Sequence, residues 1–420
     1  MRILILHRIP YPKIEYHRGI DHDRHDVTYL GTATALATLP ADLRATRAVR
    51  PGEGATYDEA VAWLDGQRGR FDRIISMSEY ELLDAARLRE RLDVPGARVE
   101  RVLLARDKVL MKSAVERAGL RVPRFLPLAD LLKRGGAAPW QGRTVLKPHR
   151  GASSENVVVF ATPAEAYAAV TARRSSAADL DTPDDNGEAV ASYQVEEFVD
   201  GPVLHFDGLV QGGRVLALTG SEYLGTCLGY AQGRPLGSFQ IRLTDGAERW
   251  VDRALDAVGI HDGSFHLEAI RDDAGELVFL EVGNRVGGAD VADTFERRTG
   301  VHLPSWELRV LLGEDVAGRL PQPPADRAWY GWFVHPGHHL GAGVLERLDG
   351  TDGFRAEALT WHELPTGTPL PDHITYGAHE TVLTGTIGAA SPDGTRDWMT
   401  RLFGSLRLHA AAHPHEGAQT

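Results

Sequence analysis

Two apolar runs on either side of a short polar turn are the clearest pattern of hydrophobic and polar positions in the chain. The runs cover residues 264–270 and 277–282, and the turn between them carries Asp272, Asp273, Ala274 and Gly275. This pattern predicts a β-hairpin. With Ala274 and Gly275 as the central turn residues, residue 268 of the first strand lies opposite residue 281 of the second.

The predicted hairpin has one apolar face and one mixed face, because side chains alternate between the two faces of a strand. The apolar face takes Phe265, Leu267, Ala269, Val278, Leu280 and Val282, and the mixed face takes His266, Glu268, Ile270, Phe279 and Glu281. Two directly opposed carboxylates repel each other, whereas Mg²⁺ would hold them together with phosphate oxygens. Arg285, in the glycine-rich turn that follows, is well placed to meet an anion beside such a metal. The same pattern also fits a solvated hairpin with two surface glutamates.

The first hundred residues have the pattern of a small parallel α/β unit. Residues 2–6 and 71–76 predict strands, and residues 58–67 and 82–91 predict helices. Glu79 follows the second strand, at the edge where open α/β sheets bind ligands. A carboxylate that favours the positive end of the next helix is the alternative role for this residue.

Two lysines lie next to predicted turns that suit phosphate groups. Residues 106–119 predict a helix with Asp107 as its N-cap, which puts Lys108 in the first turn. A strand at 144–146 ends at Lys147, and the loop 149–154 leads into a strand at 157–160. Backbone N–H groups of such a loop can cradle phosphates. Taken singly, Lys108 also fits a surface lysine, and the loop also fits an ordinary turn.

The remaining patterns predict short elements that alternate with polar segments. Helices are expected at 161–174 and 247–258, a strand at 190–199, a hairpin at 204–219, a polar loop at 175–188 and a glycine-rich mobile flap at 222–237. After the proline-rich linker 321–326, strands at 328–334, 343–348, 356–362, 385–389 and 405–409 and a helix at 395–402 indicate a mostly β region.

Composition narrows the class of protein. The 420 residues suffice for two or three domains, and 43% hydrophobic and 25% charged residues are ordinary for a globular protein. A net charge of -12 argues against nonspecific binding to nucleic acid or to an anionic membrane. Cys227 is the single cysteine, which excludes a disulfide framework. Without a long apolar run or a signal peptide, a cytoplasmic enzyme is expected.

Six features occur in an order and spacing that resemble the ATP-grasp superfamily. They are Lys108, Lys147-Pro148, Glu196-Glu197-Phe198-Val199, Glu268, Glu281 and Arg285. Within the superfamily the chain is most similar, over roughly residues 70–320, to the carboxylate–amine ligases that include the L-amino-acid (dipeptide) ligases. The resemblance implies an α/β (α+β) fold with four parts. These are an N-terminal parallel α/β domain (1–98), an ATP-grasp domain with a central antiparallel sheet (99–320, lid about 123–198), a small mostly β C-terminal subdomain (321–410) and a disordered tail (411–420).

The resemblance also implies roles for single residues. Lys108 and Lys147 would hold the ATP phosphates beneath the lid residues Ser153 and Ser154. Glu196 would meet the adenine amino group, and the Glu197-Phe198-Val199 segment would complete the hinge. Glu268 and Glu281 would ligate Mg²⁺, with Mn²⁺ as the alternative. Arg285 would act with Lys147 in catalysis by holding the acyl phosphate and the tetrahedral intermediate. The remaining substrate contacts would come from Glu79, Gly287, Gly288 and Ala289.

Three departures from the family pattern affect these roles. The position of the ribose-binding acid is Val203, so Asp207, or less readily His205, would take the ribose hydroxyls. The position of a metal-binding asparagine is Gly283, and Asn284, one place along, is expected to be the metal ligand in its stead. The lid loop has only Gly151, which would restrain its closing motion.

The function that the resemblance implies is an ATP-dependent ligase that joins a carboxylate to an amine through an acyl phosphate and releases ADP and phosphate. Amino acids or small peptides are the expected substrates, with no nucleic-acid or membrane partner, and a homodimer stays open. A biotin-carboxylase-like enzyme that forms carboxyphosphate and a nucleotide-binding homologue without turnover are the alternatives.

Overall fold

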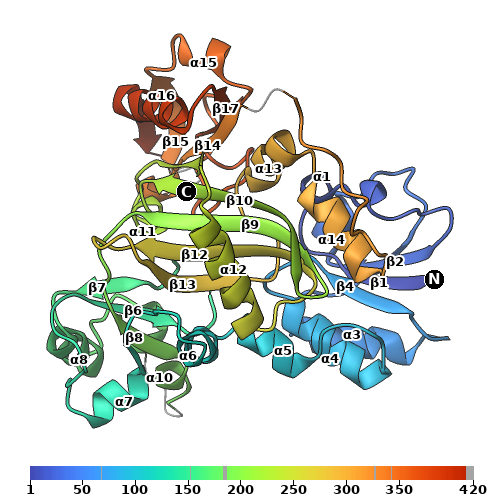
Figure 1. Cartoon of the computed structure of the whole chain (residues 1–420), viewed down its shortest axis with the longest axis horizontal. Coiled ribbons are helices and arrows are strands. Elements are labelled where there is room, and N and C mark those ends of the chain that lie inside the picture. Colours follow the sequence, from blue (N-terminus) through green and yellow to red (C-terminus); the bar gives the residue numbers. More distant parts are fainter. Residues whose placement is uncertain (68, 152, 183–186, 326–327, 342, 413–420) are drawn as a thin grey trace, which may run out of the picture.

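The computed structural model describes residues 1–67, 69–151, 153–182, 187–325, 328–341 and 343–412. Most of the described strands belong to three sheets: a parallel sheet at the N-terminus, a small antiparallel sheet in the lid region, and a long antiparallel sheet through the middle of the molecule (Figure 1). This mixed architecture confirms the expected fold class. Within the described ranges, no helix has the length and apolar character needed to cross a membrane.

The N-terminal sheet consists of four parallel strands in the order β3-β2-β1-β4. Its elements are β1 (Arg2–Leu6), α1 (Tyr11–Ile14), β2 (Asp26–Gly31), α2 (Ala33–Leu36), β3 (Thr46–Val49), α3 (Thr56–Asp65), β4 (Arg73–Ser76), α4 (Leu82–Leu92) and α5 (Val99–Leu104). Buried residues of α3 and α4 pack on one face, and α14 (Leu303–Leu311) packs on the other. The predicted strands and helices of this unit are confirmed to within two residues, whereas β2, β3 and α14 were not predicted.

The lid region contains an antiparallel sheet in the order β5-β8-β6-β7. After α6 (Lys108–Arg117), its elements are β5 (Phe125–Pro127), α7 (Leu128–Lys133), β6 (Thr144–Pro148), β7 (Val158–Phe160), α8 (Pro163–Thr171), α9 (Ala178–Asp181), α10 (Glu188–Ala191) and β8 (Tyr193–Glu197). The loop predicted at 175–188 therefore contains α9 and the start of α10, and its residues 183–186 lie outside the described residues. The strand predicted from residue 190 begins at Tyr193, because α10 takes the preceding residues.

The central sheet has eight antiparallel strands in the order β13-β12-β9-β10-β11-β14-β17-β16. They are β9 (Val203–Gln211), β10 (Arg214–Leu224), β11 (Leu236–Ile241), β12 (Gly263–Arg271), β13 (Leu277–Gly283), β14 (Trp329–His335), β16 (Thr360–Glu363) and β17 (Leu383–Ala389). α6 and α12 (Asp245–Ala257) cover one face, and α13 (Val291–Thr299) and α14 help to cover the other. The mobile flap predicted at 222–237 is instead the end of β10, α11 (Cys227–Ala231) and the start of β11.

The C-terminal region shares the central sheet, because β14, β17 and β16 extend it beyond β11. The expected mostly β C-terminal subdomain thus contributes three strands to the central sheet. The rest of the region forms the β15 (Gly343–Asp349) and β18 (Arg407–Ala412) pair with α15 (Phe354–Glu357) and α16 (Pro392–Ser405). Part of the strand predicted at 356–362 is α15. The tail expected from residue 411 begins inside β18, and residues 413–420 lie outside the described residues.

The β12–β13 hairpin has the predicted pairing at its polar end, where Glu268 lies opposite Glu281. Its turn is one residue longer than predicted: the Asp272 N–H bonds to the Glu276 carbonyl at 3.0 Å, and Gly275 has a φ of 81°. A bulge in β13 restores the register before Glu281. The prediction that Phe279 shares the glutamate face is therefore wrong, since Phe279 pairs with Ala269 and is buried in the core.

Candidate active site

A cavity of about 220 Å³ lies between the lid sheet and the β12–β13 hairpin. Its walls collect residues from separate sequence motifs: Lys108, Lys147, Ser154, Glu196, Glu197, Phe198, Val199, Glu268 and Glu281. Val145, Leu228, Ile270 and Leu280 give the cavity an apolar part, which suits a flat aromatic base. The fold thus brings the predicted phosphate-binding and metal-binding side chains to one place.

Lys108 and Glu281 connect α6 to the hairpin. The helix begins at Lys108 because the Asp107 carboxylate accepts hydrogen bonds from the N–H groups of Val109 and Leu110. The Lys108 ammonium lies 3.1 Å from the Glu281 carboxylate and donates to the Gly151 carbonyl at 2.9 Å. Burial raises the pKa of Glu281, but the charges of Lys108 and Lys147 outweigh burial and hold this pKa at about 2. Glu281 is therefore ionised at neutral pH.

Glu196 is shared by two lysines. The Lys147 ammonium lies 2.6 Å from one carboxylate oxygen of Glu196, and Lys112 is bonded to the other oxygen. The Lys112 side chain is fully buried, and burial lowers its pKa to about 8. Glu196 was expected to meet the adenine amino group; it lines the cavity, but both of its oxygens already accept from ammonium groups.

Glu268 is held from behind by a buried polar network. Its carboxylate accepts from the Tyr223 hydroxyl at 2.8 Å and lies 3.4 Å from Nε2 of His266. The Nδ1 atoms of His205 and His266 lie 2.5 and 2.7 Å from the two oxygens of Asp207. Although burial disfavours the charge of His266, Asp207 raises the pKa of this histidine to about 9. Despite its own burial, Asp207 has a pKa well below the usual range because both histidines face it.

This network corrects the expected ribose contact. Asp207 and His205 are each 1% exposed and are bonded to each other, and neither lines the cavity. Val203, at the family's acid position, does line the cavity.

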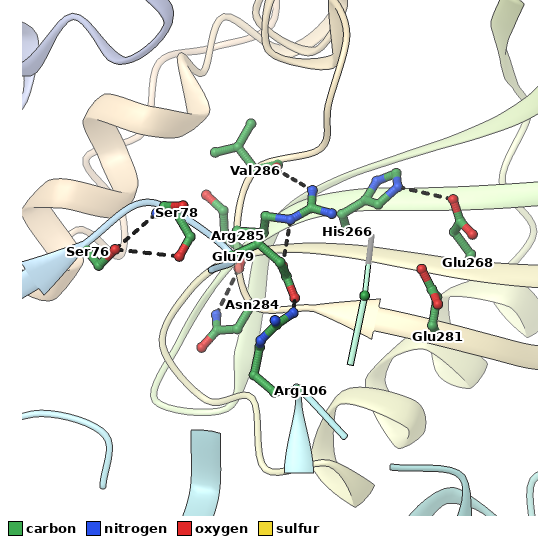
Figure 2. Close-up of polar contacts among 12 residues, drawn as sticks. Ser76, Ser78, Glu79, Arg106, His266, Glu268, Glu281, Asn284, Arg285 and Val286 are labelled. Atoms are coloured by element: carbon green, nitrogen blue, oxygen red, sulfur yellow. Dashed lines mark hydrogen bonds and ion pairs between the residues drawn. The ribbon is translucent and has the colours of Figure 1, made fainter. Parts of the chain in front are cut away.

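Glu79 lies between two arginines at the carboxyl end of β4. Figure 2 shows Arg106 and Arg285 directed at its two oxygens, with Arg285 Nε at 2.6 Å. A Cβ at Gly283 would lie 3.0 Å from the Glu79 carboxylate. A side chain at position 283 would therefore require the Glu79 carboxylate to shift.

Asn284 is not brought to the carboxylate pair. Its amide nitrogen donates to the carbonyls of Ser264 at 2.8 Å and Asp262 at 3.2 Å, and the side chain points away from Glu268 and Glu281 (Figure 2). The expectation that Asn284 ligates the metal is thus not supported by its position.

The three expected substrate residues in the turn after β13 have different surroundings. A Cβ at Gly287 would lie 2.8 Å from the Asp207 carboxylate, whereas a Cβ at Gly288 would meet no atom within 4 Å. Ala289 has a φ of 50° and packs in the apolar cluster of Tyr223 and Trp332. Gly288 therefore borders open space, and Gly287 faces the protein interior. In the lid loop, Ser154 lines the cavity and Ser153 does not.

Four residues that shape the site were not predicted as site residues: Arg106, Lys112, Tyr223 and His266. Lys112 follows Lys108 by four residues, so helical spacing alone could have placed both on one face of α6. His266 was placed on the glutamate face without a role. Tyr223 lies in the segment predicted as a flap, where no side chain had a defined direction.

No protein-family model matches the chain, but two other comparisons find similar proteins. Over 254 residues the chain is 26% identical to the L-arginine-specific L-amino acid ligase of Bacillus subtilis. That alignment covers 59% of each protein, so it spans less than two thirds of the relative. The structure is similar to that of an L-amino acid ligase from Bacillus licheniformis, with a TM-score of 0.70, 21% identity, and coverage of 97% of this chain and 98% of that one.

A phosphoribosylglycinamide synthetase from Anaerococcus prevotii is also similar in structure, with a TM-score of 0.64, 14% identity, and coverage of 97% of this chain and 99% of that one. The shared architecture extends over nearly the whole of these chains. The chain therefore has the ATP-grasp fold and is similar in sequence and in structure to L-amino-acid ligases.

Proposed function

We propose that the protein is an ATP-dependent ligase that joins a carboxylate to an amine, with amino acids or small peptides as substrates. The observation that carries the proposal is the opposed pair Glu268 and Glu281, which lines one cavity together with Lys108 and Lys147. The relationship to the L-amino-acid ligases supports the substrate class.

The cavity supports one orientation of ATP. The base would lie in the apolar part beside Phe198 and Val199, and the phosphates would meet Lys108 and Lys147 beneath Ser154. Lys147 can turn to a phosphate because Glu196 would keep its bond to Lys112, so that no buried carboxylate is left unpaired. This arrangement gives Glu196 a role in positioning Lys147.

The carboxylate pair fits a hard divalent cation. Glu268 and Glu281 offer oxygen ligands of the kind that Mg²⁺ or Mn²⁺ takes in proteins. The Lys108 ammonium, which pairs with Glu281, shows that a positive charge is favourable at this position. Bound Mg²⁺ would neutralise charge on the phosphates. The two glutamates come from adjacent, hydrogen-bonded strands of the central sheet, which would keep the pair in register.

The proposed reaction has two steps. A carboxylate oxygen of the acid bonds to the γ-phosphorus of ATP as the bond to ADP breaks. The amine nitrogen of the second substrate then bonds to the carbonyl carbon, phosphate leaves with the electrons of the broken C–O bond, and the nitrogen gives up a proton. Arg285, held by Glu79, would face the negative charge of the phosphoryl group and of the tetrahedral intermediate.

A substrate matrix of acids and amines, with arginine among the amino acids, tests the proposal. The expected products are ADP, phosphate and an amide detected by mass, and hydroxylamine should trap the activated acid as a hydroxamate. Formation of AMP and pyrophosphate would refute the acyl phosphate route. Turnover that needs only bicarbonate would favour the carboxyphosphate alternative, and ATP binding without any turnover would favour the non-catalytic one.

A further inference from the structure

The carboxyl ends of β1 and β4 form a second polar region near Arg285. In the N-terminal sheet, β1 pairs with β2 on one side and with β4 on the other, so the chain connections diverge between β1 and β4. Open α/β sheets bind ligands at the carboxyl ends of strands at such a divergence. Arg8 follows β1 at this edge, and Glu79 and Tyr80 follow β4.

Arg8 and Tyr80 form a pair at this edge. Tyr80 is a large aromatic side chain that stays 50% exposed, and the Arg8 guanidinium carbon lies 4.9 Å from the centre of its ring. Burial and the charge of Glu155 in the lid loop raise the pKa of Tyr80, whereas the charges of Arg8 and Arg285 lower it. The Tyr80 hydroxyl therefore lies within reach of charges from the N-terminal sheet, the hairpin turn and the lid.

The two acids on either side of Tyr80 in the sequence already have cationic partners. Glu79 is shared by Arg106 and Arg285. Glu81, the other acid that Arg8 acts on, is 1% exposed and is paired with Arg50 at 3.1 Å. Arg8 has no ion-pair partner among the residues that the structure describes. The Arg8 guanidinium thus stacks on the Tyr80 ring without a described ion-pair partner, in a chain whose net charge is -12. Such a guanidinium beside the site suits an anionic ligand.

We propose that Arg8, supported by the Tyr80 ring, is the subsite for a carboxylate carried by the amine substrate. This inference rests on the proposed function, in which Arg285 faces the phosphoryl group and the tetrahedral intermediate formed from the acid. A second carboxylate in the reaction then belongs to the amine, as it does in an amino acid. The Arg8 guanidinium would select amines that carry this group and would orient them with the amino nitrogen toward the activated acid.

Matched pairs of amines test the subsite directly. The probes are L-alanine with L-alaninamide and L-phenylalanine with L-phenylalaninamide, coupled to the acid that gives the most hydroxamate. For the parent protein, kcat/KM should be higher for each amino acid than for its amide. In Arg8→Met the ratio between the two should fall at least tenfold, mostly through KM, and Arg8→Lys should recover part of it. Arg44→Met, which changes an exposed arginine of the same domain, should leave the ratio at the parent value.

The outcomes separate the subsite from the proposed function. Hydroxylamine carries no carboxylate, so a parent protein that forms no hydroxamate with any acid would fail the proposed function itself. If hydroxamate forms, three results would overturn the subsite alone. They are equal use of amino acids and amides, no coupling of either member of a pair, and an unchanged ratio in a folded Arg8→Met protein. Circular dichroism and melting of each variant establish that it is folded.

Discussion

At the scale of single residues, the charge balance of Glu281 decides how the site responds to metal. Burial raises the pKa of this carboxylate, but the charges of Lys108, Lys147 and Arg285 outweigh burial and keep it low. Glu281→Gln should therefore lower the free energy of unfolding of the metal-free protein by about 1 kcal/mol, because Lys108 loses its partner. It should reduce turnover by more than 100-fold, since charge neutralisation on the phosphates is weakened.

Thermal melting with and without MgATP separates these two effects. The parent should gain melting temperature on adding MgATP by mass action, and Glu281→Gln should gain much less. Glu276→Gln, in the exposed turn of the same hairpin, is the matched control and should behave as the parent does. Equal shifts in all three proteins, with full activity in Glu281→Gln, would place the carboxylate outside the nucleotide site.

Lys112 offers a residue-scale test of the shared carboxylate. Lys112→Met keeps an unbranched side chain one atom shorter but leaves buried Glu196 with Lys147 alone. We expect a loss of about 3 kcal/mol in the free energy of unfolding, because one partner of a buried ion pair is gone. KM for ATP should rise about tenfold, since Glu196 then competes with the phosphates for Lys147.

The double variant Lys112→Met, Glu196→Gln provides the control for this explanation. Removing the carboxylate along with the ammonium should return most of the lost stability in urea unfolding. If the single and double variants lose the same stability, the two side chains do not act as a pair.

At the scale of elements, the hairpin shows what the sequence could and could not predict. Alternation and the turn residues were enough to place Glu268 opposite Glu281, because both strands carry a clear period of two. The extra turn residue and the compensating bulge depend on Gly275 adopting a left-handed φ, which the sequence permits without requiring it. The register was therefore correct at the glutamates and wrong by one residue at Phe279.

Residue roles were harder to predict where a side chain has a partner distant in sequence. Asp207 was a plausible ribose ligand until the fold enclosed it between His205 and His266. Asn284 was a plausible metal ligand until its amide bonded to the carbonyls of Ser264 and Asp262. The sequence alone does not determine which way these two side chains point. Their direction depends on how neighbouring strands and turns pack in the folded protein.

At the scale of the whole molecule, the continuous central sheet joins the nucleotide cavity to the C-terminal region. β14 hydrogen-bonds to β11, and Phe239 of β11 is buried in a cluster otherwise built largely from C-terminal residues. α11 provides a second connection, because its Tyr230 hydroxyl donates to the carbonyl of Thr375 in the C-terminal region at 2.5 Å. Cys227 and Leu228 of the same helix line the cavity. The wall of the nucleotide site thus depends on chain that lies beyond the residue 320 boundary.

A chain truncated after residue 320 should therefore fail to fold, although it contains every residue expected to bind ATP. Truncation removes the partner of β11, exposes an unpaired strand edge and uncovers Leu236 and Phe239, so aggregation should follow.

The matched control keeps all residues but carries a protease site in the exposed linker segment 321–325. After cleavage its two pieces should elute together and keep the MgATP-induced rise in melting temperature, because the sheet and not the linker holds them. Size-exclusion chromatography and melting of both proteins provide the measurement; a monomeric 1–320 chain that still responds to MgATP would show that the C-terminal strands are dispensable for the site.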